Sequence, residues 1–385
     1  MLDTATRTIF EPEHAQFRDA VRKFFAAEML PHSARWDEAG IVDRSFWLKA
    51  GEAGLLCPSV VPEYGGLGLD FRTNTVVGEE LAYSGATPSL RLHSDIVVPY
   101  LEKYGTEEQK SQYLPKMVSG ELIVAIGMSE PGAGSDLKAI TTSAVRAKNE
   151  NGGEDYVING SKTYITNGQL CDMVILVAKT QPELGAKGVS LILVEADRAG
   201  FTKGKKLDKI GQRSADTSEL FFADVRVPIA NRLGEEGRGF IYLMSQLPQE
   251  RLSIAVAAQA QAQRCFDEAV AYTKQRKAFG QTVFDFQNTR FTLAGLKAEL
   301  QGGWAHLDWC IARLVAGTLT NEQASAAKLL HTEMQWKVAD AAMQLHGGAG
   351  YINDYPIARL WKDARITRIW GGSNEIMKEI IGRTL

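Results

Sequence analysis

The spacing of apolar residues changes twice along this chain, and that change constrains the fold more than any other feature. From about residue 11 to residue 120 apolar side chains recur at helical spacing. From about residue 121 to Pro228 the chain consists of short alternating or continuously apolar runs, which are typical of strands. From about residue 237 the helical spacing returns. This order predicts an α+β fold and not the strand–helix alternation of a Rossmann fold.

Individual elements follow from the same spacing. We expect Pro31 to end a first helix, and the glycines of residues 61–70 to form a loop. Asn159 and Gly160, between two short apolar runs, indicate a hairpin. The apolar face of the first helix consists of Phe17, Val21, Phe24, Phe25 and Met29. Later helices are expected at about residues 250–278, 288–315, 321–346 and 373–382, the last with Ser373 as its N-cap.

Composition narrows the class of protein. A chain of 385 residues is long enough for two or three domains, and a net charge of −3 without a basic stripe argues against nucleic-acid binding. The six histidines show no metal-binding spacing, and the four separated cysteines indicate free thiols in a reducing compartment. We expect no membrane span, no metal and no leader peptide. A cytoplasmic location is favoured, and a processed form in the mitochondrial matrix stays open.

Two stretches of the β region have the composition of ligand-binding segments. "GMSEPGAGSDL", residues 127–137, leaves a strand and offers glycines, hydroxyls and backbone amides to a planar or phosphorylated ligand. An ordinary Pro/Gly loop is the alternative. In "SKTYITNG", residues 161–168, strand alternation puts Tyr164 and Thr166 on one side. A buried cross-strand aromatic is the alternative there.

Three stretches of the C-terminal region could hold an anion. "QRKAFGQTVFDFQ" puts Arg276 and Phe279 on one helical face, where Arg276 is either a solvated charge or a diphosphate clamp. "QLHGGAGY" ends a helix in glycines that could be a simple C-cap, and we expect its His346 to be structural. "IWGGSNEI" has paired glycines before a helix N-terminus, which can bind an anion or a carbonyl oxygen through backbone amides.

The stretch "LPQERLSIA", residues 247–255, places a carboxylate at the expected start of a long helix. Pro248 is tolerated in a first helical turn, and Glu250 would then lie at the positive end of the helix dipole. On this reading Glu250 is a surface acid that contributes roughly 0.3–1 kcal/mol to stability.

These stretches, in this order and at these separations, resemble the acyl-CoA dehydrogenase family. The resemblance covers essentially the whole chain and also includes "GQRSADTSELFFADVRVP". It implies a helical N-terminal domain (residues 1–121), a middle β-barrel-like domain (122–232) and a C-terminal four-helix bundle (233–385). It further implies binding of FAD and an acyl-CoA thioester, a homotetramer, and an electron-transferring flavoprotein as electron acceptor.

The resemblance also assigns roles to residues of this chain. The flavin ring would meet Ile126, Met128, Ser129, Gly134, Ser135, Tyr164 and Thr166. The adenosine diphosphate part would be held, partly across a subunit interface, by Arg276, Phe279, Gln287, Gln344, Gly347 and Gly348. Ser373 and Glu375 would close over the same cofactor, and the substrate would meet Ser135, Arg251, Gly371 and Gly372. Many relatives have tryptophan where this chain has Tyr164.

The position of the catalytic base departs from the commonest family pattern. Most relatives carry their catalytic glutamate where this chain has Gly371, whereas a smaller, long-chain branch supplies it from the helix around "LPQERL". We therefore expect Glu250 to remove the α-proton, with a pKa raised by burial, and FAD N5 to accept the hydride. The backbone N–H of Gly371 would donate to the thioester oxygen, and its lack of a side chain would leave space for the carboxylate.

Arg251 points about 100° around the helix from Glu250, so we expect a supporting role near the substrate and no ion pair with Glu250. A non-catalytic acyl-CoA-binding scaffold and an oxygen-using acyl-CoA oxidase remain alternative functions. The sequence does not fix the acyl chain, and long, medium and branched chains all stay open.

Overall fold

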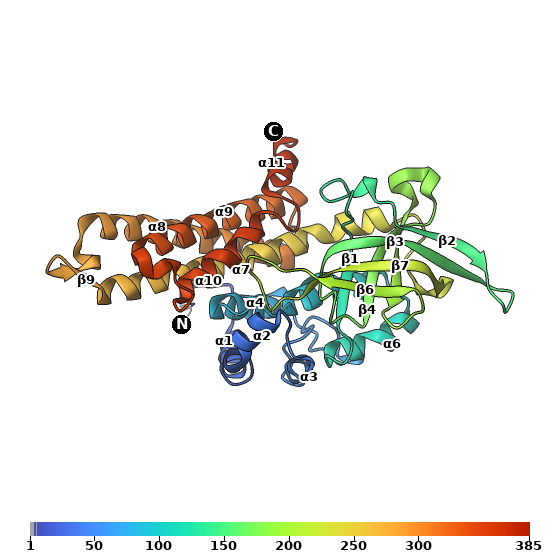
Figure 1. Cartoon of the computed structure of the whole chain (residues 1–385), viewed down its shortest axis with the longest axis horizontal. Coiled ribbons are helices and arrows are strands. Elements are labelled where there is room, and N and C mark those ends of the chain that lie inside the picture. Colours follow the sequence, from blue (N-terminus) through green and yellow to red (C-terminus); the bar gives the residue numbers. More distant parts are fainter. Residues whose placement is uncertain (1–3, 5) are drawn as a thin grey trace.

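The computed structural model describes residue 4 and residues 6–385, and it arranges them as helices, then a sheet, then long helices (Figure 1). The N-terminal region contains α1 (Pro12–Phe24), α2 (Ser33–Ala39), α3 (Arg44–Glu52), α4 (Phe71–Ser84), α5 (Val98–Tyr104) and α6 (Glu107–Val118). A buried ion-pair network joins α1 to α4, because Arg18 contacts Glu79 at 2.7 Å and Glu80 at 2.8 Å.

The expectation that Pro31 ends the first helix is wrong. The α-helix ends at Phe24, continues as a π-helical turn over Phe25–Met29, and then passes through a 3₁₀ turn, Leu30–His32, into α2. Pro31 lies in that 3₁₀ turn, where a residue without an N–H is tolerated. The predicted apolar face does pack into the core through Val21, Phe25 and Met29.

The middle region forms one eight-stranded sheet. Its strands are β1 (Val124–Gly127), β2 (Ser143–Lys148), β3 (Glu154–Thr166), β4 (Met173–Lys179), β5 (Val189–Glu195), β6 (Phe201–Lys206), β7 (Thr217–Pro228) and β8 (Arg232–Leu233). They are ordered β6-β7-β3-β2-β4-β5-β8, with β1 parallel to β4. Alternate residues of β4 enter two different cores, so both faces of this strand are buried, as its continuous apolar run requires.

The hairpin expected at Asn159 and Gly160 is absent. Both residues lie inside the single strand β3, where the register with β7 shifts between Ile158 and Gly160. Gly160 has φ +146°, and a Cβ there would stand 2.5 Å from Thr142 Oγ1. The pair therefore marks a bulge with a close backbone approach, which has the same sequence signature as a tight turn.

The C-terminal region is helical, as predicted. It contains α7 (Gly239–Gln275), α8 (Gln287–Val315), α9 (Asn321–His346), α10 (Pro356–Ala364) and α11 (Asn374–Gly382). Helix α9 contacts the other four. Ser373 caps α11 by accepting a hydrogen bond from the Ile376 amide, which confirms the predicted cap. Helix α7 begins well before the expected start, so that Pro248 is internal.

In the part of the chain that the structure describes, no helix is long and apolar enough to cross a membrane. The family-derived domain limits after residues 121 and 232 stay predictions, and β8 crosses the second limit by pairing with β5.

Candidate active site

Glu250 is buried in the middle of α7, with 6% of its surface exposed. The hydroxyl of Tyr100, on α5, donates a hydrogen bond of 2.7 Å to Glu250 Oε1. Among the described residues Oε2 has no hydrogen-bond partner, so one carboxylate oxygen is free to accept a proton. Burial opposes the charged form and raises the pKa of Glu250 to about 7.

The helix-dipole interpretation of Glu250 is wrong. Because α7 begins at Gly239, Glu250 lies about three turns inside the helix, beyond the reach of its positive end. A carboxylate in such a buried place, with its pKa near neutrality, is instead a candidate general base.

Arg251 points away from Glu250, as expected. Its guanidinium Nη1 donates to Asn321 and, at 3.0 Å, to Ser325 Oγ, both on α9. Arg251 therefore ties α7 to α9 directly beside the candidate base.

The Gly371–Gly372 segment meets α7 one helical turn beyond Glu250. Both glycines have positive φ, +63° and +87°. A Cβ at position 371 would stand 2.3 Å from Ile254 Cδ1. Ile254, on the same helix as Glu250, thus occupies the space that a side chain at position 371 would need.

Lys328, on α9, holds this glycine segment in place. Its ammonium donates to the Gly372 carbonyl oxygen at 2.8 Å and to Asn374 Oδ1 at 2.7 Å. Burial lowers the pKa of Lys328 to about 8. The sequence interpretation did not single out this lysine, because it lies mid-helix in a stretch without a recognisable motif.

The loop of residues 127–137 is clamped to β3 by a buried ion pair. Lys162 Nζ donates to Glu130 Oε1 at 2.8 Å and to the Met128 carbonyl oxygen at 3.1 Å. Glu130 also accepts from the amides of Thr141 and Thr142. Neither Lys162 nor Glu130 was predicted as a functional residue from the sequence, although an inward-facing lysine on a strand is a recognisable signal.

The outer side of this loop is open. Nothing lies within 4 Å of a Cβ built at Gly132 or Gly134. Tyr164 is 72% exposed and has φ +60°, so the alternative of a buried cross-strand aromatic is wrong. An exposed ring beside an open, clamped glycine loop provides a flat surface with backbone donors, which fits a planar ligand.

Arg276 and Phe279 do not share a helical face. Helix α7 ends at Gln275, and a two-stranded hairpin follows, β9 (Lys277–Ala278) and β10 (Gln281–Thr282). Phe279, 95% exposed, forms its turn with Gly280, both at positive φ, as a type I′ turn requires. The sequence pattern missed this turn because Phe is unusual at such a position.

The remaining predicted cofactor residues of this region lie at helix ends. Gln287 begins α8, and Gln344 lies in the last turn of α9 just before the open Gly347 and Gly348. His346 is structural, as expected: its Nδ1 contacts the Ala342 carbonyl oxygen at 2.7 Å.

The predicted cofactor residues form two separate groups. Figure 1 shows the β9 hairpin at one end of the molecule and the sheet at the other. Arg276 directly follows the helix that carries Glu250, and the two residues are about 39 Å apart at 1.5 Å per residue. One chain therefore does not bring both groups to a single small molecule.

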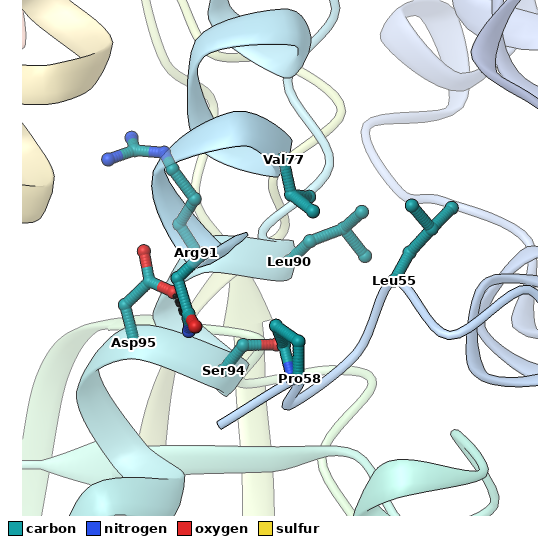
Figure 2. A pocket seen from close by; sticks show the side chains of 8 residues that line it. Leu55, Pro58, Val77, Leu90, Arg91, Ser94 and Asp95 are labelled. Carbon is teal, nitrogen blue, oxygen red and sulfur yellow. Dashed lines mark hydrogen bonds between the residues drawn. The ribbon is translucent and has the colours of Figure 1, made fainter. Parts of the chain in front are cut away.

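Two cavities lie beside Arg91, and α7 lines the second of them through Ala257 and Gln261. Figure 2 shows the first, beside Arg91 and Asp95, and its lining consists of Leu55, Pro58, Asn74, Val77, Leu90, Arg91, Ser94 and Asp95. The second has a volume of about 50 Å³ and shares Arg91 with the first.

Comparisons with known proteins agree with this architecture. Family models described as the acyl-CoA dehydrogenase N-terminal, middle and C-terminal domains match residues 11–121, 125–225 and 237–385. The chain is 48% identical to the mitochondrial long-chain specific acyl-CoA dehydrogenase of Sus scrofa, over 100% of this chain and 89% of that protein. It is 36% identical to the mitochondrial isovaleryl-CoA dehydrogenase of Solanum tuberosum, over 99% and 92%. A crystal structure of acyl-CoA dehydrogenase from Geobacillus kaustophilus superposes with a TM-score of 0.95 at 48% identity, covering 98% and 99% of the two chains.

Proposed function

The chain belongs to the acyl-CoA dehydrogenase family, and from this premise we propose that it oxidises an acyl-CoA thioester to the trans-2-enoyl-CoA with Glu250 as the base. The observation that carries the assignment is the buried carboxylate of Glu250, which has one free oxygen and a pKa of about 7. A base with that pKa is ionised in a large fraction of molecules at neutral pH and still basic enough to take a proton.

The reaction needs more than a base. A bound FAD supplies the acceptor for the hydride, which no amino-acid side chain can provide. The open loop at residues 127–137 and the exposed Tyr164 ring support FAD as the cofactor, because together they leave an aromatic face and the glycine backbone accessible to a planar ligand. We assign the flavin ring to this surface, with Ile126, Met128, Ser129, Gly134, Ser135, Tyr164 and Thr166 around it.

Gly371 would act through its backbone. Its N–H is proposed to donate to the thioester oxygen, where charge grows as the α-proton leaves. Lys328 supports this role by fixing the next carbonyl, that of Gly372. Arg251 would position the α7–α9 contact beside the substrate.

The separation of the two residue groups supports an oligomer. If Arg276, Phe279, Gln287, Gln344, Gly347 and Gly348 hold the adenosine diphosphate part, they must serve the flavin of another copy. The exposed Phe279, Phe291 and Tyr351 provide apolar surface for such contacts. We therefore propose a homotetramer, as is typical of the family, with Ser373 and Glu375 closing over the cofactor.

We further propose an electron-transferring flavoprotein as the electron acceptor. A reducing compartment, the cytoplasm or the mitochondrial matrix, agrees with four buried free cysteines.

Substitution of Glu250 tests the proposal. Glu250→Gln should bind FAD and assemble as the wild type does, but anaerobic addition of acyl-CoA should no longer bleach the flavin. Glu102→Gln is the matched control, since burial also raises the pKa of Glu102 to about 7, whereas its one charged neighbour is Lys110 and it has no contact with Glu250 among the described residues. Bleaching of Glu250→Gln at the wild-type rate would show that the base lies elsewhere.

A further inference from the structure

The second cavity lies directly beyond the candidate reaction centre. Its wall includes Trp370, which precedes Gly371, and Ala257 and Gln261 of α7. Ala257 follows Glu250 by seven residues, about 10 Å along the helix. An acyl chain whose α-carbon meets Glu250 would therefore point its distal carbons at this cavity if it followed α7.

Trp370 and Arg91, both in the wall of this cavity, have donor groups for which no partner is found among the described residues. The indole Nε1 of Trp370 is buried and has no partner. Arg91 donates through Nη1 to the Ser253 carbonyl oxygen at 2.6 Å, but its Nε and Nη2 have no partner among the described residues. Buried donors without acceptors are rare in folded proteins, because each forfeits its interaction with water.

The amide of Gln261 adds a third donor. Thr367 donates to Gln335 Oε1 at 2.6 Å, and Gln335 in turn donates to Gln261 Oε1. This chain of bonds occupies Gln261 Oε1, and no hydrogen bond from Gln261 Nε2 is found among the described residues.

No carboxylate of the described residues forms an ion pair with Arg91. Asp95 lies one turn along the same helical segment, and it accepts a bond of 2.6 Å from the Ser253 hydroxyl. Figure 2 shows the guanidinium directed away from the apolar Val77, Leu90 and Leu55. Burial lowers the pKa of Arg91, because removal from water disfavours the charged guanidinium, and the charge of Asp95 offsets part of this effect.

We propose that the acyl chain of the substrate carries an oxygen substituent remote from the thioester, a hydroxyl, carbonyl or carboxylate, which accepts hydrogen bonds from Arg91 and Trp370. This inference rests on the proposed function and specifies its substrate class. A site that hydrogen-bonds a substrate oxygen discriminates strongly against the plain hydrocarbon chain, since that chain leaves the donors unpaired.

The test compares CoA thioesters of matched length in the holoenzyme. Octanoyl-CoA, ω-hydroxyoctanoyl-CoA and suberyl-CoA are assayed by anaerobic flavin bleaching and by competitive binding, together with the dodecanoyl series. The wild type should prefer an oxygenated thioester, and Arg91→Met should reduce that preference by roughly 10- to 100-fold, the value of a hydrogen bond to a charged group. Arg238→Met changes an exposed arginine whose side chain forms no hydrogen bond with the described residues, and it should leave the preference unchanged.

Each outcome has one meaning. A preference for suberyl-CoA identifies a carboxylate, and a preference for the hydroxy compound identifies a neutral oxygen. If the plain thioester is the best substrate and Arg91→Met leaves the ratios unchanged, the inference is wrong while the dehydrogenase assignment stands. If no thioester bleaches the flavin, the proposed function itself fails. Trp370→Phe, which removes one unpaired donor, repeats the test if Arg91→Met does not fold.

Discussion

The Tyr100 hydroxyl and the Glu250 carboxylate form a hydrogen bond of 2.7 Å across 150 residues of sequence. The bond stabilises the charged carboxylate and so holds the pKa of Glu250 below the value that burial alone would give. Tyr100→Phe should therefore raise that pKa further, by about one unit for a bond worth about 1.4 kcal/mol.

The pH dependence of kcat/KM measures this change. Activity of Tyr100→Phe should fall at neutral pH and recover as the pH is raised, because the base then ionises again. An unchanged acidic limb with lower activity at every pH would mean that Tyr100 orients the substrate and does not tune the base.

Moving the carboxylate to position 371 should require a second change. In Glu250→Gln/Gly371→Glu the new side chain meets Ile254, whose Cδ1 lies 2.3 Å from the required Cβ position. Adding Ile254→Ala should raise the rate of flavin bleaching by about tenfold, equivalent to about 1.4 kcal/mol of the barrier. Equal rates with and without Ile254→Ala would refute the steric argument, and the positive φ at 371 would then be the larger obstacle.

Lys328→Met should impair catalysis while leaving the base, Glu250, unchanged. Losing the bonds to Gly372 and Asn374 frees the segment that is proposed to bind the thioester oxygen, and a displacement of about 1 Å costs on the order of 100-fold. We expect the loss mainly in kcat, with the acidic limb of the pH profile retained. Lys337→Met is the control, since Lys337 lies exposed on the same helix and, among the described residues, pairs with Glu299 alone. An equal loss in both variants would show that Lys328 has no positioning role.

The stability of Glu250→Gln relative to wild type should increase with pH. Below pH 4.5 Glu250 is protonated in both the native and the unfolded state and contributes no difference. Between pH 4.5 and about 7 the unfolded chain loses its proton first, so the wild type loses stability as pH rises. Above about pH 7 the wild type has lost up to about 3 kcal/mol of unfolding free energy relative to Glu250→Gln, and this difference no longer changes with pH. Thermal melts of both proteins at pH 5 and pH 8 measure this, and a constant difference would contradict the raised pKa.

The sequence predicted the architecture well, because amphipathic spacing over long segments is a strong signal. The helices at residues 288–315 and 321–346 and the Ser373 cap agree with the structure. Local signals were weaker. Pro248 indicated a helix start but is internal to α7, and the Asn159–Gly160 pair marks a bulge. In both places tertiary packing overrides a residue's usual preference.

The candidate site was predictable only in part. The pairing of a carboxylate at 250 with a glycine at 371 followed from the family pattern. The residues that contact them did not follow from it. Tyr100 and Lys328 reach the site from α5 and α9, whose placement only packing decides, and the contact between Ile254 and Gly371 depends on how the chain end docks on α7. The sequence did not single out Arg91 either, because an isolated arginine in a helix is usually exposed to solvent.

The buried Lys162–Glu130 pair has a consequence for cofactor loading. It fixes the 127–137 backbone by contacts within the protein alone, so the apoprotein should already hold this loop in shape. Association of a cofactor would then lose little conformational entropy there, and reconstitution should proceed without an ordering step at the loop.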